Sequence, residues 1–155
     1  MPLSSWCERG IVHLETGHLV FNHERTQAKR KQQILIKMLA APVNPADINQ
    51  VQGTYPLPEQ KVHIAGNEGV GCVEYVGSGV RKVQVGDWVI PRRNYFGTWR
   101  EQIVCLEDDV TVVPKTLSLH VAASLKVNPP TAYRLLRDFV TLRAGTLSIP
   151  SSAYV

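Results

Sequence analysis

Tyr55 is the residue whose type and setting first suggest chemistry. It lies in the stretch QGTYPLPEQ, residues 52–60, on a loop flanked by glycine and proline where no hydrophobic core requires a phenol. Binding residues concentrate on such loops, so this phenol can reach a ligand. On spacing alone, an exposed or half-buried loop tyrosine without a ligand is the favoured interpretation, and both alternatives stay open.

Other groups that commonly carry chemistry form no recognisable site. Three of the five histidines, His13, His18 and His23, recur every five residues, which places them on no common helical face and on alternating faces of a strand. The acidic run at residues 107–109 is typical of a solvated turn. Serines occur, but no G-x-S-x-G sequence marks a hydrolase nucleophile. We therefore predict no metal site and no hydrolase.

A glycine-rich stretch, GNEGVGCVEYVGSGV at residues 66–80, raises the question of a phosphate-binding loop. A dinucleotide fingerprint requires G-x-G-x-x-G between a strand and a helix. Here the first three glycines are spaced G-x-x-G-x-G, and the β-rich run CVEYV follows them. We interpret these glycines as strand and turn positions or as sites of close backbone approach. No G-x-G-x-x-G sequence occurs in the 155 residues.

Composition indicates one soluble domain with enough sequence for a core. The chain is 44% hydrophobic, with a mean hydropathy of −0.09. Its apolar runs fall far short of the roughly 20 residues that span a bilayer, so we expect no membrane partner. The net charge is +4, but the only basic run is RTQAKRK, residues 25–31, which is typical of a solvated face or linker rather than a nucleic-acid contact.

Cysteine usage and the N-terminus bear on the compartment. Three cysteines, an odd number without a C-x-x-C pair, favour a reducing environment over a disulfide framework. The first twenty residues contain two glutamates and one arginine, and they resemble neither a secretory signal nor an arginine-rich transit peptide. The N-terminus therefore gives no route of import.

The hydrophobic pattern divides the chain into four zones. Residues 1–33 are a polar, divergent N-terminal segment. Residues 34–117 carry short β runs separated by turns, as in a barrel or sandwich. Residues 118–143 have helical periodicity, and residues 144–155 form a divergent tail. The fold class is therefore mainly β with a few helices.

Individual elements can be placed within these zones. Short strands are expected at residues 11–14 and 18–21, and a turn at NPAD, residues 44–47. Two helices are expected, in LSLHVAASL and in PPTAYRLLRDFV, the second starting near Pro130 and Thr131. The predicted central strands are ILIKML, GVGCVEYVG, WVIP, EQIVC and VTVVP.

Several motifs, taken in order, resemble a known family. The motifs are NPADINQVQGTYP, GNEGVG, GDWVIP, GTWREQIV and VNPPTAYRLL. They cover roughly residues 34–145, and agreement of several motifs in order is far more specific than any one of them. With these motifs the chain resembles the medium-chain dehydrogenase/reductase superfamily and, within it, the mitochondrial 2-enoyl thioester reductases.

The resemblance implies a GroES-like, partly opened β barrel followed by a Rossmann domain that binds NADPH. It implies reduction of enoyl-CoA or enoyl-acyl-carrier-protein in mitochondrial fatty acid synthesis, and a homodimer for full-length members. On this basis Tyr55 falls on the family's proton-donating tyrosine. A phenol with an ordinary pKa near 10 is protonated at neutral pH and suits that role. Asn128 matches an asparagine that contacts NADPH.

One position separates branches of the superfamily. Zinc alcohol dehydrogenases have G-H-E where this chain has Gly66-Asn67-Glu68, and their histidine is a zinc ligand. An asparagine is a poor zinc ligand, and the cysteine-rich structural zinc lobe is absent. The resemblance therefore favours the zinc-free reductases. Tyr55 favours the enoyl branch over quinone oxidoreductases.

Departures from the family pattern leave an alternative open. Lys126 replaces a small residue and Pro130 a more permissive one, and TLSIPSSAYV stands where a strand and a glycine-rich loop are expected. We interpret the chain as a fragment, splice form or imperfect gene model that is inactive alone. The alternative is a non-catalytic GroES-like module that binds a partner or the full-length enzyme, through the apolar face of TAYRLLRDFV.

Overall fold

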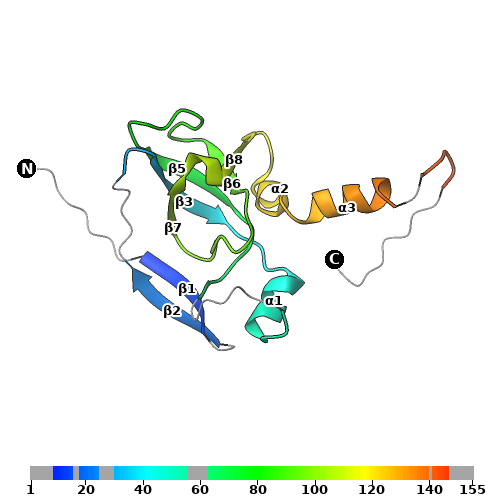
Figure 1. The fold of residues 1–155 in the computed structure, drawn as a ribbon, viewed down its shortest axis with the longest axis horizontal. Helices are drawn as coiled ribbons and strands as arrows, with labels where there is room; N and C mark the ends of the chain where they lie inside the picture. Colours follow the sequence, from blue (N-terminus) through cyan, green and yellow to red (C-terminus); the bar gives the residue numbers. More distant parts are fainter. Residues whose placement is uncertain (1–8, 16–17, 25–29, 56–62, 140, 147–155) are drawn as a thin grey trace, which may run out of the picture.

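The chain folds around one antiparallel sheet of five strands, seen at the top of Figure 1. The computed structural model describes residues 9–15, 18–24, 30–55, 63–139 and 141–146. Strand order in this sheet is β7-β3-β5-β6-β8. The strands are β3 (Gln33–Ala40), β5 (Val70–Val76), β6 (Trp88–Pro91), β7 (Gln102–Leu106) and β8 (Val110–Val113). All five match strands expected from the sequence.

A smaller sheet of three strands has the order β2-β1-β4. The strands β1 (Arg9–Glu15) and β2 (His18–Glu24) pair antiparallel as a hairpin, and β4 (His63–Ile64) pairs with β1. Each hairpin strand is longer than the sequence predicted, so this part of the N-terminal segment is less irregular than expected. The connection between the two strands, residues 16–17, lies outside the described residues.

Strand β3 is the centre of the large sheet because it pairs with both β5 and β7. Its buried side chains alternate, with Ile34 and Ile36 almost fully buried, as the two-residue period of a strand requires. The main hydrophobic core packs on these positions and contains Ile34, Ile36, Val73, Val80, Val83, Val89, Phe96, Ile103, Cys105 and Val110. Branched aliphatic side chains, which favour strands, dominate it.

The large sheet does not close on itself. In the described part of the chain, β7 and β8 are its two edges and each pairs on one side only. A second core cluster covers one end, where α2 (Leu119–Ser124) packs Ala122 and Ala123 against Val70, Ile90 and Val113. The result is the predicted mainly β, partly opened GroES-like architecture.

The turn predicted at NPAD is wrong, because these residues begin the helix α1 (Pro45–Val51). Proline stands at the first helical position, where its missing N–H is tolerated, and the backbone N–H of Asn44 donates to Asp47 Oδ2 at 2.8 Å. A short 3₁₀ helix, η1 (Glu107–Asp109), occupies most of the predicted LEDD turn. Its Glu107 is more than solvated charge, because it accepts the backbone N–H groups of Arg81 and Lys82.

The last described helix, α3 (Asn128–Arg137), projects away from the sheets (Figure 1). It begins at Asn128, two residues before the predicted start, and none of its residues is buried. Its apolar face stays exposed, and Phe139 just beyond its end is 75% accessible. No described helix is long and apolar enough to cross a membrane.

Candidate functional site

The loop between β4 and β5 turns at Gly66, which has φ = +94°. A Cβ at this position would lie 2.4 Å from Thr98 Oγ1 and 2.4 Å from Trp99 Cδ1, so only glycine fits. As the sequence predicted, this glycine serves a turn and a close approach. The turn points the next two side chains, Asn67 and Glu68, toward α1 and the start of α3.

The Asn67 side chain joins α1 to a neighbouring loop. Its Nδ2 donates to Asp47 Oδ1 at 2.7 Å and to Gln50 Oε1 at 3.1 Å, and both acceptors lie on the buried face of α1. Its Oδ1 accepts the backbone N–H of Tyr95 at 3.1 Å. Tyr95 has φ = +54°, an uncommon conformation that this hydrogen bond helps to hold. One amide therefore satisfies three polar groups.

Glu68 is the most deeply buried charged residue of the described chain, with 1% of its surface accessible. Its Oε1 accepts Asn44 Nδ2 at 2.7 Å, and its Oε2 accepts the backbone N–H of Val127 at 3.0 Å. Burial raises the pKa of Glu68 above its ordinary value, and the hydrogen bonds from Asn44 and Val127 only partly oppose this. The carboxylate thus links the residue before α1 to the residue before α3.

Lys126 adds a positive charge beside this carboxylate. Its Nζ donates to the backbone oxygen of Asn67 at 3.2 Å and to that of Arg93 at 2.5 Å. Burial lowers the pKa of Lys126, while Glu68 nearby acts in the opposite direction. Lys126, which the sequence comparison predicts to be a departure from the family pattern, thus tethers two loops to the start of α3.

We call Asn67 and Glu68, with the residues they bond, the Asn67–Glu68 node. It connects three segments that are far apart in sequence. The backbone oxygen of Glu68 also accepts a hydrogen bond from the Thr98 hydroxyl at 2.7 Å. This bond attaches the node to the loop that contains Thr98. The other members are Asn44, Asp47, Gln50, Tyr95, Lys126 and Val127.

Tyr55 lies on the turn that follows α1, and 41% of its surface is accessible. Its backbone N–H and that of Thr54 both donate to the oxygen of Asn49, at 3.3 and 2.9 Å. The Thr54 hydroxyl donates to the same oxygen at 3.2 Å. The turn is thus folded back onto α1, so the position of Tyr55 depends on that of the helix. Its phenol is open to a ligand.

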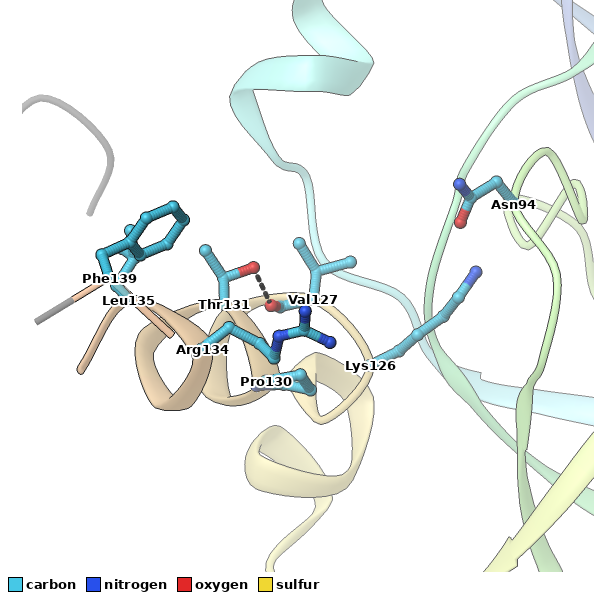
Figure 2. Close-up of a pocket in the computed structure, with 8 residues that line it drawn as sticks. All are labelled: Asn94, Lys126, Val127, Pro130, Thr131, Arg134, Leu135 and Phe139. Carbon is cyan, nitrogen blue, oxygen red and sulfur yellow. Dashed lines mark hydrogen bonds between the residues drawn. The ribbon is translucent and has the colours of Figure 1, made fainter. Parts of the chain in front are cut away.

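Asn128 is the first residue of α3 and is exposed. A hollow of about 440 Å³ lies along this helix, between Lys126 and Asn94 on one side and the apolar residues Leu135 and Phe139 on the other. Figure 2 shows Lys126 extending toward Asn94, and the Thr131 hydroxyl donating to the Val127 oxygen at 2.7 Å. Pro130 also lines this hollow. Tyr55 follows α1 and Asn128 begins α3, and Glu68 joins the two residues that directly precede these helices.

The sequence did not single out Asp47, Gln50 and Glu68, because the contacts that make them part of the site come from residues 17 to 59 positions away. A signal existed for Asp47, because Asn-Pro-x-Asp is a helix-start pattern. No group of three histidine, cysteine, aspartate or glutamate side chains in the described residues could hold a metal ion. Asn67 itself is fully engaged in hydrogen bonds, so these residues do not fit the zinc of alcohol dehydrogenases.

Comparison with known proteins adds independent information. Residues 30–115 match the alcohol dehydrogenase GroES-like domain. The mitochondrial enoyl-[acyl-carrier-protein] reductase of Caenorhabditis elegans is 50% identical over 113 residues, which cover 73% of this chain and 33% of the relative.

Two solved structures share the fold. A point mutant of Etr1p in complex with NADP and crotonyl-CoA superposes with a TM-score of 0.81 at 31% identity, covering 88% of this chain and 45% of the other. The mitochondrial 2-enoyl thioester reductase Etr1p/Etr2p heterodimer from Candida tropicalis superposes with a TM-score of 0.77 at 30% identity, with the same coverage. The chain spans less than half the length of these relatives.

Proposed function

This chain belongs to the alcohol dehydrogenase GroES-like domain family, and from that premise we propose that it is the GroES-like part of an NADPH-dependent mitochondrial 2-enoyl thioester reductase. The observation that carries the proposal is the Asn67–Glu68 node. It joins the helix that leads to an exposed phenol, Tyr55, to the helix that begins with an exposed amide, Asn128. The names of the relatives support the same reaction class.

The reaction requires an acid near the thioester. NADPH, when bound, supplies a hydride to C3 of the enoyl thioester. Negative charge then builds on the thioester oxygen, and a proton must reach C2. Tyr55 is the group of this chain that we assign to hydrogen-bond that oxygen or protonate C2. Its exposure on a turn held by α1 leaves the phenol accessible to substrate.

Asn128 is the residue of this chain that we assign to NADPH. It is exposed at the first position of α3, beside the hollow that Lys126 borders. Most of the cofactor site must come from elsewhere, because the 155 residues contain no G-x-G-x-x-G sequence. Hydride transfer requires the nicotinamide to be held against the substrate. We therefore infer that these residues alone have no reductase activity.

The substrate class is an enoyl thioester carried by CoA or by acyl-carrier protein. The net charge of +4 suits either the phosphates of CoA or an acidic carrier protein. The mitochondrial relatives support a mitochondrial location, and the solved heterodimer supports a dimeric assembly of the complete enzyme. The relatives named above are reductases, so they favour this function over a non-catalytic binding module.

The test is an activity assay on the chain joined to the nucleotide-binding domain of a relative. We expect NADPH oxidation with crotonyl-CoA, and we expect Tyr55→Phe to lower kcat by about 10² to 10⁴, the usual contribution of a general acid. The matched control is Tyr75→Phe, which removes the same hydroxyl from an exposed position on β5. Equal activity of the two variants would remove Tyr55 from the proposal, and no activity in the parent would count against the function itself.

A further inference from the structure

We propose that Asn67 is a positioning residue that holds helix α1, which leads into the turn carrying Tyr55, against the segment leading into α3. The inference rests on the proposed function, because that function gives Tyr55 and Asn128 their importance. Asn67 would touch neither substrate nor cofactor and would act through the two helices.

The first half of this connection runs from Asn67 to Tyr55. The Nδ2 group donates to Asp47 and Gln50, which are 3% and 7% accessible. Helix α1 has only seven residues, so two buried side-chain bonds are a large part of what fixes it. The oxygen of Asn49, on the same helix, accepts the N–H groups of Thr54 and Tyr55. A shift of α1 therefore moves the phenol.

The second half runs from the same residue to the start of α3. The backbone oxygen of Asn67 accepts Lys126 Nζ, and the adjacent Glu68 carboxylate accepts the N–H of Val127. These two contacts fix the residues directly before Asn128. A change in the conformation of residue 67 therefore reaches both α1 and the start of α3.

The position requires an amide. Asn67 donates two hydrogen bonds through Nδ2 and accepts one through Oδ1. An ionised carboxylate can only accept, so an aspartate at this position would face the Asp47 carboxylate as a like charge. The zinc enzymes that this chain resembles carry a metal-binding histidine at the corresponding place. In this chain the asparagine at that place instead joins α1 to the loop at Tyr95 through hydrogen bonds.

The connection can be tested by exchanging the acid and the amide. Asn67→Asp puts two carboxylates together, and Asp47→Asn puts two amides together. The double variant restores one amide and one acid with the net charge unchanged. In it, Nδ2 of the new asparagine donates to residue 67, its Oδ1 still accepts the Asn44 N–H, and Gln50 can turn its own amide toward the new aspartate. The double variant should therefore recover what each single variant loses.

The measurement is amide hydrogen exchange on the purified 155-residue chain and its variants, without cofactor. We expect Asn67→Asp to speed exchange at Gln52, Thr54, Tyr55 and Val127 by about tenfold or more, because the variant loses the hydrogen bond to the charged Asp47 and places a second carboxylate beside it. Strand β3 amides should change by less than about twofold. The double variant should return the affected amides to within about threefold of the parent.

A matched control is Gln84→Glu, the same amide-to-acid change at an exposed position, which should leave all these amides unchanged. If Asn67→Asp fails to fold, Asn67→Ala removes the same bonds without adding charge and should loosen the same amides. Uniform loss of protection over the whole sheet, or no recovery in the double variant, would overturn the proposal. Because exchange is measured without cofactor, a failed reductase assay would leave this result standing and would count only against the proposed function.

Discussion

Replacing Glu68 with alanine should destabilise the domain by about 2–4 kcal/mol. The carboxylate accepts Asn44 Nδ2 and the Val127 N–H, and the change leaves both donors without that acceptor. An unsatisfied buried donor costs about 1–3 kcal/mol, so two of them cost about 2–6 kcal/mol. Part of this is returned, because the variant no longer buries an acidic group whose pKa is raised by burial. The remainder is a large fraction of the 5–15 kcal/mol by which domains are usually stable.

The same residue should give a distinct pH dependence. The pKa of Glu68 in the folded state lies above its ordinary value of 4.5, so the folded state binds this proton more tightly than the unfolded state does. The stability that the neutral acid contributes is fully present below pH 4.5 and is lost as the pH rises through the raised pKa. The free energy of unfolding of the parent, compared with that of Glu68→Gln at the same pH, should therefore fall as the pH rises from 4.5 through the raised pKa.

The assay for both effects is urea denaturation followed by the fluorescence of Trp88 and Trp99. Glu101→Ala is the control, because it removes an exposed carboxylate and should change stability by less than about 0.5 kcal/mol. A loss below about 1 kcal/mol for Glu68→Ala would refute the view that this carboxylate holds the node. If the parent instead became more stable than Glu68→Gln as the pH rises, burial could not be the dominant effect on the pKa of Glu68.

Two further predictions concern the surroundings of the site. Gly66→Ala should lower the free energy of unfolding by about 2–5 kcal/mol, because it combines a positive φ with a Cβ 2.4 Å from Thr98 Oγ1. Gly53→Ala, with φ = +70° and open space around it, should lower it by only about 1–2 kcal/mol. Urea denaturation compares the two variants, and equal losses of stability would contradict the role given to packing at Gly66. Burial raises the pKa of the Cys105 thiol to about 12, so about one molecule in ten thousand is a thiolate at pH 8. Iodoacetamide should therefore label Cys105 far more slowly than the half-buried Cys72. Mass spectrometry of the labelled peptides measures the two rates. Comparable labelling rates in the folded protein would show that Cys105 is less protected than its position in the core implies.

The strands could be predicted because their signal is local. Alternating branched residues such as Ile34 and Ile36 place β3 from its own sequence, and the same holds for the other four strands of the large sheet. The two-residue strand β4 could not be found, because it is defined by its pairing with β1, about 50 residues away. Helix α1 was mistaken for a turn because Asn, Pro and Asp favour both, and the seven-residue helix has little apolar periodicity.

The site divides in the same way. Tyr55 and Asn128 were selected by a resemblance in short motifs, and their roles stay predictions. The Asn67–Glu68 node could not be predicted, because a buried carboxylate is identified only by the distant groups that bond it. Pattern alone gave Glu68 no more weight than Glu107. A surface accessibility of only 1% and two hydrogen-bond donors, from residues 44 and 127, distinguish it.

The most direct test of the central claim is a titration with NADPH, by fluorescence or calorimetry. The purified 155-residue chain would be compared with the same chain extended by the nucleotide-binding domain of a relative. Our account predicts binding in the extended protein only, and weaker binding when Asn128 is replaced by alanine there. Binding by the 155 residues alone would contradict it, because a cofactor site would then be assembled without the glycine-rich loop.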